Sequence, residues 1–119
     1  MFQKSGDKVW TTGPFSLQPP VLYQLVHLVG CDFAHVGMFG GYLTETVEEL
    51  RQRIQALQTT IPSFSCGMTP DLGKKIVQTF GTEVMLTSGG WVHGQREGIT
   101  AACRRLRQVA DETEQAVTV

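Results

Sequence analysis

The sequence predicts an α/β protein in which helices cover a parallel sheet, and three observations lead to this class. Two short apolar runs each continue into a turn of small residues. The runs are IPSF at 61–64 and VML at 84–86, and the turns are SCG at 65–67 and TSGG at 87–90. Between them lies a helix pattern that starts at Thr69 and Pro70 and ends at Gly81. This repeated order of strand, glycine turn and helix is typical of parallel α/β folds.

The other predicted elements continue this alternation toward the N-terminus. Pro19 and Pro20 precede a helix that ends at Gly30, as proline and glycine at opposite helix ends predict. The next helix has apolar residues at steps of three and four, so one face is buried. The predicted strands are 33–38, 61–66 and 83–87, preceded by a short β-prone stretch at 9–12, and the predicted helices are 21–29, 47–57, 70–80 and 99–109.

Counted from the stretch at 9–12, the chain holds four βα units, half the number in an eight-stranded (β/α)8 barrel. The alternative is an open four-stranded sheet that does not form part of a barrel. We expect a single domain over 1–119, because this length is enough for one core. The polar residues 1–8 are expected to be a frayed start or a cut edge, and 111–119 are expected to be a flexible tail.

Composition and charge exclude several classes of protein. The chain is 41% hydrophobic and 18% charged, with a formal net charge of −1. These values indicate a globular chain without a nucleic-acid or membrane partner. The three cysteines, Cys31, Cys66 and Cys103, have no CxxC or CxxH spacing, so neither a disulfide framework nor a structural zinc site is expected. Free thiols favour a reducing compartment, hence the cytoplasm.

Five residues at the predicted carboxyl ends of the strands are candidates for binding a phosphate group. Adjacent glycines at Gly89 and Gly90 permit a strained turn that exposes backbone N–H groups. Gly67 offers another bare N–H, and Ser65 offers a hydroxyl, although both suit an ordinary turn equally well. His35 stands late in its strand and either reaches the same face or is a core histidine.

No catalytic residue can be named from the sequence. Cys66 borders the predicted cradle and could be a nucleophile, but a small buried thiol is the more ordinary interpretation. His93 follows the glycine turn and could reach the same face. No paired-carboxylate motif and no P-loop are present, and Asp71, Glu83 and Glu97 lack a spacing that suggests metal ligation.

Between about residues 20 and 108 the segments, in their order and spacing, resemble one family. It is the C-terminal part of the barrel domain of the ribulose-bisphosphate carboxylase (RuBisCO) large chain and RuBisCO-like proteins. The end of the family's fifth barrel helix is similar to LVGCD at 28–32, and its sixth strand is similar to FAHVG at 33–37. The seventh strand is similar to PSFSCGM at 62–68. The eighth strand and the residues after it are similar to LTSGG at 86–90 and HG at 93–94.

The resemblance implies the C-terminal half of a TIM (β/α)8 barrel. It further implies that His35 and Ser65 face a phosphorylated sugar, while Gly67, Gly89 and Gly90 hold one phosphate through backbone N–H groups. The family's magnesium ligands, among them a carbamylated lysine, belong to a strand that this chain does not contain. We therefore expect no cofactor in this chain, and Mg²⁺ only if the missing barrel half is supplied.

Departures from the family pattern favour a RuBisCO-like relative over a carboxylase. Tyr42 stands where the resemblance places the catalytic loop lysine of carboxylases. Cys66 and Ser88 replace glycines of the seventh-strand and eighth-strand motifs. The family's fifth-strand His-Arg pair has no clear counterpart near 9–13.

The expected function is that of a RuBisCO-like fragment or subunit carrying the phosphate-binding half of a phosphosugar enolase or isomerase site, inactive alone. The alternative is a non-catalytic phosphate-binding or structural half-barrel that self-associates. A half-barrel has two unpaired sheet edges, so a homodimer or a complementary barrel half is the expected protein partner. The expected ligand is a phosphorylated sugar or phosphate.

Overall fold

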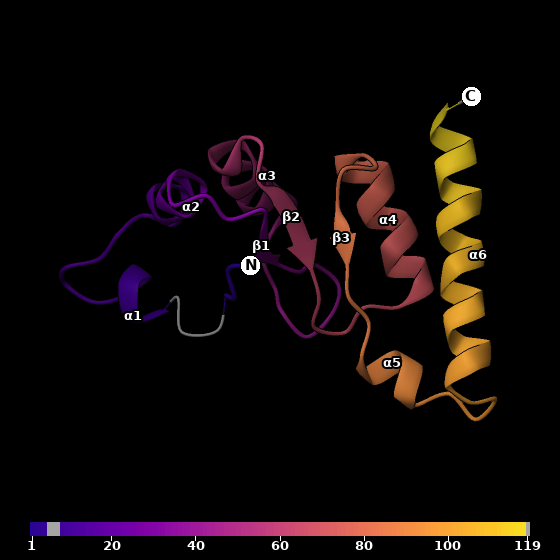
Figure 1. Cartoon of the computed structure of the whole chain (residues 1–119). Coiled ribbons are helices and arrows are strands. Elements are labelled where there is room, and N and C mark those ends of the chain that lie inside the picture. The colour runs from indigo at the N-terminus through magenta and orange to yellow at the C-terminus, as the bar shows by residue number, and fades with distance from the viewer. Residues whose placement is uncertain (5–7, 119) are drawn as a thin grey trace.

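Three parallel strands form the centre of the computed structural model, which describes residues 1–4 and 8–118 (Figure 1). The strands are β1 (Phe33–Gly37), β2 (Ile61–Phe64) and β3 (Met85–Leu86), side by side in that order. His35 is paired with Ser63, and Ser63 with Met85, so these three residues cross the sheet in one row. The carboxyl ends of the strands therefore meet at one edge, as the sequence predicted.

The helices lie in two groups. At one end of the molecule, α2 (Pro19–Leu28) packs against α3 (Val47–Leu57), and α3 also covers β1 and β2. At the other end, α4 (Pro70–Phe80) packs against the long helix α6 (Ile99–Thr118), beyond β3 (Figure 1). The short helix α5 (Gly90–His93) connects β3 to α6. All four predicted main helices are present.

Local capping explains where α3 and α4 begin. The Thr46 hydroxyl accepts the Glu49 N–H at 3.2 Å, and the Glu49 carboxylate accepts the Thr46 N–H at 2.8 Å, which together form a capping box. Thr69 caps α4 by accepting the Leu72 N–H. Helix α4 ends at Gly81, as predicted, and this residue has φ +92°, a conformation that favours glycine.

The core lies between the sheet and its covering helices. Phe64 is fully buried and stacks on Phe80 at a centroid distance of 5.4 Å. Phe80 in turn meets Phe39 edge-on at 6.2 Å, so the loop after β1 is packed against α4. The buried cluster comprises Tyr23, Val26, Ala34, Val36, Met38, Leu50, Ala56, Leu57, Phe64, Met68 and Ile76.

The expected strand at 9–12 is wrong, because Lys8–Thr11 forms the short helix α1. The place beside β1 is instead held by Phe2, which forms a single parallel bridge to Ala34. Its N–H donates to the Phe33 carbonyl and its own carbonyl accepts the His35 N–H, both at 2.9 Å. The described residues thus contain a three-stranded sheet plus this bridge, not four full βα units. Residues 5–7 of the expected frayed start lie outside the described residues, whereas Phe2 is paired.

Helix α6 is longer than predicted, because the expected tail at 111–119 continues the helix through Thr118. Two pairs at four-residue spacing support the extension: Arg107 bonds Asp111 at 2.8 Å, and Gln108 bonds Glu112 at 2.9 Å. Thr113 is buried one turn after the last predicted apolar position. Val119 lies outside the described residues. Within the described chain, no helix is both long and apolar enough to cross a membrane.

Candidate functional site

A pocket of about 360 Å³ opens at the carboxyl ends of β2 and β3. We call it the glycine pocket. Four of the five predicted site residues line it, namely Ser65, Gly67, Gly89 and Gly90. The structure therefore brings together two turns that are more than twenty residues apart in the sequence. The remaining lining residues are Tyr42, Cys66, Met68, Thr69, Thr87 and Trp91.

His35, the fifth predicted residue, lies behind the pocket and is buried. Its Nε2 is 2.7 Å from the Ser65 Oγ, so the ring contacts a residue of the pocket wall. The Tyr23 hydroxyl donates to the His35 carbonyl at 2.9 Å and holds this part of β1 against α2. His35 is therefore a core histidine that also reaches the site through Ser65, which combines the two interpretations left open by the sequence.

The turn after β2 has an unusual backbone. Cys66 has φ +71° and Gly67 has φ +90°, two successive residues in the left-handed region. A Cβ at Gly67 would lie 3.1 Å from the Gly41 Cα and the Tyr42 nitrogen, so a side chain here would meet the loop after β1. The Cys66 carbonyl accepts the Tyr42 N–H at 3.1 Å. This turn and the loop that carries Tyr42 are thus packed backbone to backbone.

The turn after β3 differs from the expected one. Gly89 has φ −89° and ψ −63°, an ordinary helical conformation, so the predicted strained turn at Gly89–Gly90 is wrong. What glycine provides here is space, because a Cβ on either residue would meet no protein atom within 4 Å. Both glycines are exposed toward solvent. A ligand can approach this backbone closely.

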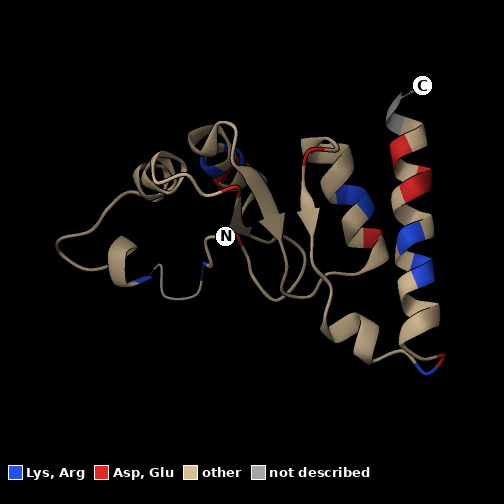
Figure 2. Cartoon of the chain, viewed as in Figure 1, with Lys and Arg blue, Asp and Glu red and all other residues tan. Residues whose placement is uncertain are grey.

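The walls of the glycine pocket combine polar and apolar groups but carry no Lys, Arg, Asp or Glu side chain. None of the ten lining residues is Lys, Arg, Asp or Glu, and the segment from β3 through α5 has no charged residue (Figure 2). One positive charge touches the wall from outside, since the Arg105 guanidinium lies over the Trp91 ring at 5.9 Å. Of the wall hydroxyls, Thr87 donates to the Phe64 carbonyl at 3.1 Å. Recognition in this pocket would therefore depend on backbone N–H groups and hydroxyls.

Of three other residues that the sequence placed near the site, two line the glycine pocket and one does not. Cys66 is exposed in the pocket wall and not the buried thiol that we considered more ordinary; its Sγ is 3.7 Å from the Ser65 Oγ. Tyr42 is 84% exposed and lines the pocket. His93 ends α5, is exposed, and does not line the pocket. Across residues 1–4 and 8–118, no three His, Cys, Asp or Glu side chains gather as metal ligands would.

A charged cluster below the loop after β1 was not predicted. The Glu45 carboxylate is 3.0 Å from the Lys4 Nζ and 3.3 Å from the Arg53 Nη1, and it accepts the Met38 N–H at 3.2 Å. Arg53 also donates to the Val36 carbonyl at 2.7 Å. All three charged side chains are largely buried. The cluster joins the N-terminal segment, the end of β1 and α3, and so supports the loop that carries Tyr42.

The pKa of Glu45 follows from these contacts. Burial raises the pKa, but the Met38 N–H and the Lys4 ammonium lower it by more, so the pKa lies below the ordinary value of 4.5. A lowered pKa in the folded state contributes stability above the unfolded value, and this contribution disappears as the pH falls through the folded value. We expect the stability difference between wild type and Glu45→Gln to be full at pH 7 and to shrink below about pH 4.5. Urea unfolding at pH 7, 5 and 3 measures this, and a difference that stays constant would contradict it.

The chain is similar to known proteins in both sequence and structure. No protein-family model matches the chain. It is 26% identical to the ribulose bisphosphate carboxylase of Thermococcus kodakarensis, over 82% of this chain and 27% of that protein. It is 31% identical to an uncharacterised ribulose bisphosphate carboxylase-like protein of Bordetella bronchiseptica, over 72% of this chain and 24% of that protein. A shorter match, 37% identical over half of this chain, is to a 2,3-diketo-5-methylthiopentyl-1-phosphate enolase of Exiguobacterium sibiricum, of which it covers 15%.

The fold also has a counterpart among solved structures. The octameric RuBisCO of Pyrococcus horikoshii, crystallised with sulfate, superposes with a TM-score of 0.84 over 96% of this chain and 29% of that one. The sequence identity in that superposition is 21%, so the likeness concerns the fold. The chain spans about a quarter of the length of the curated carboxylases and carboxylase-like proteins that it matches.

Proposed function

The chain is a partial RuBisCO-like domain from the C-terminal part of the barrel, and from this premise we propose that it carries the phosphate-binding half of a phosphosugar site. The relatives are named for ribulose bisphosphate and for a 2,3-diketo-5-methylthiopentyl 1-phosphate, which are both phosphate esters. The reaction class proposed for the complete site is enolisation or isomerisation of a phosphorylated sugar. The ligand proposed for this chain alone is the phosphate group.

One observation carries the proposal: Ser65, Gly67, Gly89 and Gly90 line a single pocket, and the space beside the backbone of Gly89 and Gly90 is open to a ligand. Backbone N–H groups that no side chain covers are suited to phosphate oxygens. With the ring proton on Nε2, His35 donates to Ser65, whose hydroxyl can then donate to a phosphate oxygen. Because no cationic side chain lines the pocket, we expect weak binding, with a Kd of about 1 mM, or roughly −4 kcal/mol.

Substituting valine at Gly89 or Gly90 tests the proposal. The new side chain would meet no protein atom within 4 Å at its Cβ, so the fold should tolerate it, but it would fill the space above the backbone. We expect affinity for ribose 5-phosphate to fall at least tenfold, about 1.4 kcal/mol, in calorimetry or ligand-detected NMR. Thr59→Val, an exposed change outside the pocket, serves as the control. Unchanged affinity in both glycine variants would place the phosphate elsewhere.

We propose further that the chain does not fix carbon dioxide. A loop lysine offers a positive charge to a developing carboxylate, and the phenol of Tyr42 offers none. The expected result is no incorporation of labelled bicarbonate into acid-stable product with ribulose 1,5-bisphosphate and Mg²⁺. An intact RuBisCO assayed in parallel shows that the conditions support turnover. Measurable carboxylation by the purified chain would refute this expectation.

A non-catalytic role is the second candidate, and one observation favours it. The carboxylate of Glu45, which is largely buried, is already bound by Lys4, Arg53 and the Met38 N–H, so it is unsuited to hold Mg²⁺. In this proposal the chain needs no cofactor and is a phosphate-binding or structural half-barrel. Its protein partner is a second copy or a complementary barrel half, and its free thiols favour the cytoplasm. Phosphate binding without turnover, measured on the same preparation, distinguishes this role from catalysis.

A further inference from the structure

Ser65 and His35 form a pair in which a hydroxyl in the wall of the glycine pocket lies against an imidazole behind that wall. The Ser65 Oγ is 2.7 Å from the His35 Nε2. Ser65 lines the pocket, whereas His35 does not and is only 6% exposed. A hydroxyl within hydrogen-bond reach of a neutral imidazole is the arrangement that makes serine a nucleophile, because the ring can take the hydroxyl proton.

The sheet holds this imidazole in place. The His35 N–H donates to the Phe2 carbonyl and the His35 carbonyl accepts the Tyr23 hydroxyl, both at 2.9 Å. Ser63 is paired with His35 in register, and it shares a face of the sheet with Ser65 because alternate residues of a strand point the same way. The buried Ser63 hydroxyl has no hydrogen-bond partner in the part of the chain that the structure describes. Such a hydroxyl is unusual, and here it leaves a polar atom on the strand beside a base that becomes positively charged when it takes a proton.

The turn after Ser65 offers two backbone donors. Strand β2 ends at Phe64, and the N–H groups of Cys66 and Gly67 donate to no acceptor among the described residues. In acyl transfer, the N–H of the residue that follows the nucleophile is a recurrent donor to the negative oxygen of the tetrahedral intermediate. Nucleophile, base and oxyanion donors are therefore supplied by one turn and the strand next to it.

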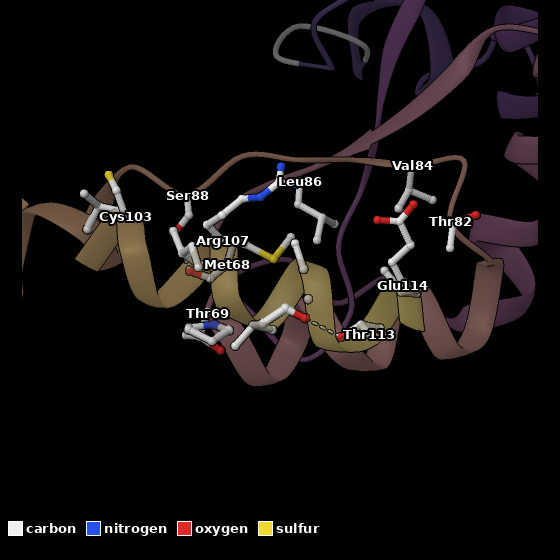
Figure 3. A pocket seen from close by; sticks show the side chains of 17 residues that line it. Met68, Thr69, Thr82, Val84, Leu86, Ser88, Cys103, Arg107, Thr113 and Glu114 are labelled. Carbon is white, nitrogen blue, oxygen red and sulfur yellow. Dashed lines mark hydrogen bonds between the residues drawn. The ribbon is translucent and has the colours of Figure 1, made fainter. Parts of the chain in front are cut away.

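A larger cavity, between α4, α6 and β3, offers no such pair. It measures about 650 Å³ (Figure 3). The Ser88 hydroxyl on its wall donates to the Met68 carbonyl at 3.0 Å, and the Thr113 hydroxyl donates to the Val109 carbonyl at 2.6 Å. No histidine is among its described lining residues. Of these two cavities, only the glycine pocket has a hydroxyl beside a base.

We propose that Ser65 is a nucleophile toward small neutral carboxylic esters, with His35 as its general base. The Ser65 Oγ bonds to the ester carbonyl carbon while its proton passes to the His35 Nε2. The carbon–oxygen bond to the alcohol then breaks, the alcohol leaves with that proton, and the acyl group stays on Ser65. Water, giving a proton to the same Nε2, releases the carboxylic acid and restores the hydroxyl, so ester and water become acid and alcohol.

The walls of the glycine pocket indicate the class of ester. They carry no Lys, Arg, Asp or Glu side chain, so a charged ester would gain no ion pair there, and Met68 and Trp91 add apolar surface. A volume of about 360 Å³ suits a short acyl chain on a small alcohol. This activity does not rest on phosphate binding, for which the imidazole carries its proton on Nε2 and not on Nδ1.

Hydrolysis of p-nitrophenyl acetate by the Cys66→Gly chain is the first test. The substitution removes an exposed thiol 3.7 Å from the Ser65 Oγ that would compete for the acyl group, and glycine suits the φ of +71° at this position. We expect p-nitrophenol release above the buffer rate, and an acetyl group on the Ser65 peptide in mass spectrometry of an early quenched sample. Ser65→Ala should lower the protein-dependent rate roughly tenfold or more. Ser16→Ala, at an exposed serine outside the pocket, should leave it unchanged.

His35→Gln tests the base. It should also lower the rate roughly tenfold or more, and combining it with Ser65→Ala should cause no further loss, because the two residues act as a unit. The control is His93→Gln, at an exposed histidine that does not line the pocket. Circular dichroism checks the fold, and Ser65→Ala, at a half-buried position, decides alone if the buried glutamine unfolds the chain.

Three results would each overturn the inference. They are a rate equal to that of buffer, an unchanged rate in Ser65→Ala or in folded His35→Gln, and acetyl groups on lysines or cysteines but not on Ser65. Titration of the same variants with inorganic phosphate is read separately. Ester hydrolysis and phosphate binding can therefore fail independently of each other.

Discussion

Replacing Phe64 by alanine is expected to lower the free energy of unfolding by about 3–5 kcal/mol. Phe64 is fully buried between the sheet and α4, and its ring stacks on Phe80 at 5.4 Å. Truncation removes this contact and leaves a cavity that the paired strands β1, β2 and β3 cannot collapse into. The loss is a large part of the roughly 5–15 kcal/mol that stabilises a whole domain, so the variant should be partly unfolded at 37 °C.

Urea unfolding followed by circular dichroism measures this effect. Phe15→Ala is the matched control, because Phe15 is 95% exposed and the same truncation should change stability by no more than about 0.5 kcal/mol. A loss below 1 kcal/mol at Phe64 would show that the core is not built around β2. An equal loss at Phe15 would show that its ring is covered in solution, as a partner would cover it.

Replacing Glu45 by alanine should have an effect of similar size, about 3–5 kcal/mol at pH 7. The change leaves the ammonium of Lys4 and the guanidinium of Arg53 largely buried without their carboxylate, and it frees the Met38 N–H. An uncompensated buried charge costs more than the ion pair itself contributes. Since the cluster supports the loop that carries Tyr42, the glycine pocket should also lose its order.

The control for Glu45 is Glu97→Ala, which removes an exposed carboxylate and should change stability by about 0.5 kcal/mol or less. Combining Glu45→Ala with Lys4→Met should recover part of the loss, because the second change removes one of the stranded charges. Strictly additive losses in the double variant would mean that Lys4 and Glu45 act independently, against the contact at 3.0 Å.

The helices were predictable because their signals are local. The capping residues Thr46, Glu49 and Thr69 lie within four residues of the hydrogen bonds that they form, and Gly81 ends its helix by its own backbone preference. The end of α6 was missed because the apolar stripe stops at Val109. The turns beyond it are supported by polar pairs, which also occur in solvated segments.

The strand beside β1 was not predictable for the opposite reason. A single bridge at Phe2 carries no pattern, and the β-prone residues at 9–12 indicate an extended preference but no pairing partner. The charged cluster is a similar case, since Lys4 and Glu45 are forty-one positions apart and no periodicity links them. Such contacts arise only from the tertiary fold.

The site residues occupy an intermediate position. The sequence was enough to predict which residues lie together, because the carboxyl ends of parallel strands meet at one edge of a sheet. These residues are Ser65, Gly67, Gly89 and Gly90. The backbone conformations of these turns could not be predicted. Cys66 adopts the left-handed conformation that usually favours glycine, whereas Gly89 adopts an ordinary helical one. The contact between His35 and Ser65 follows from neighbouring strands but required the register of β1 and β2.

Titration of the ¹⁵N-labelled chain with inorganic phosphate, followed by amide chemical shifts, shows whether the glycine pocket binds phosphate. We expect saturating shifts, at millimolar phosphate, for the amides of Gly67, Gly89 and Gly90, with smaller changes at Ser65 and none on the distant helix α2. A matched titration with sodium chloride at equal ionic strength removes the effect of screening. Shifts confined to the arginines of α6, or no shifts at these three glycines, would mean that phosphate does not bind in the glycine pocket.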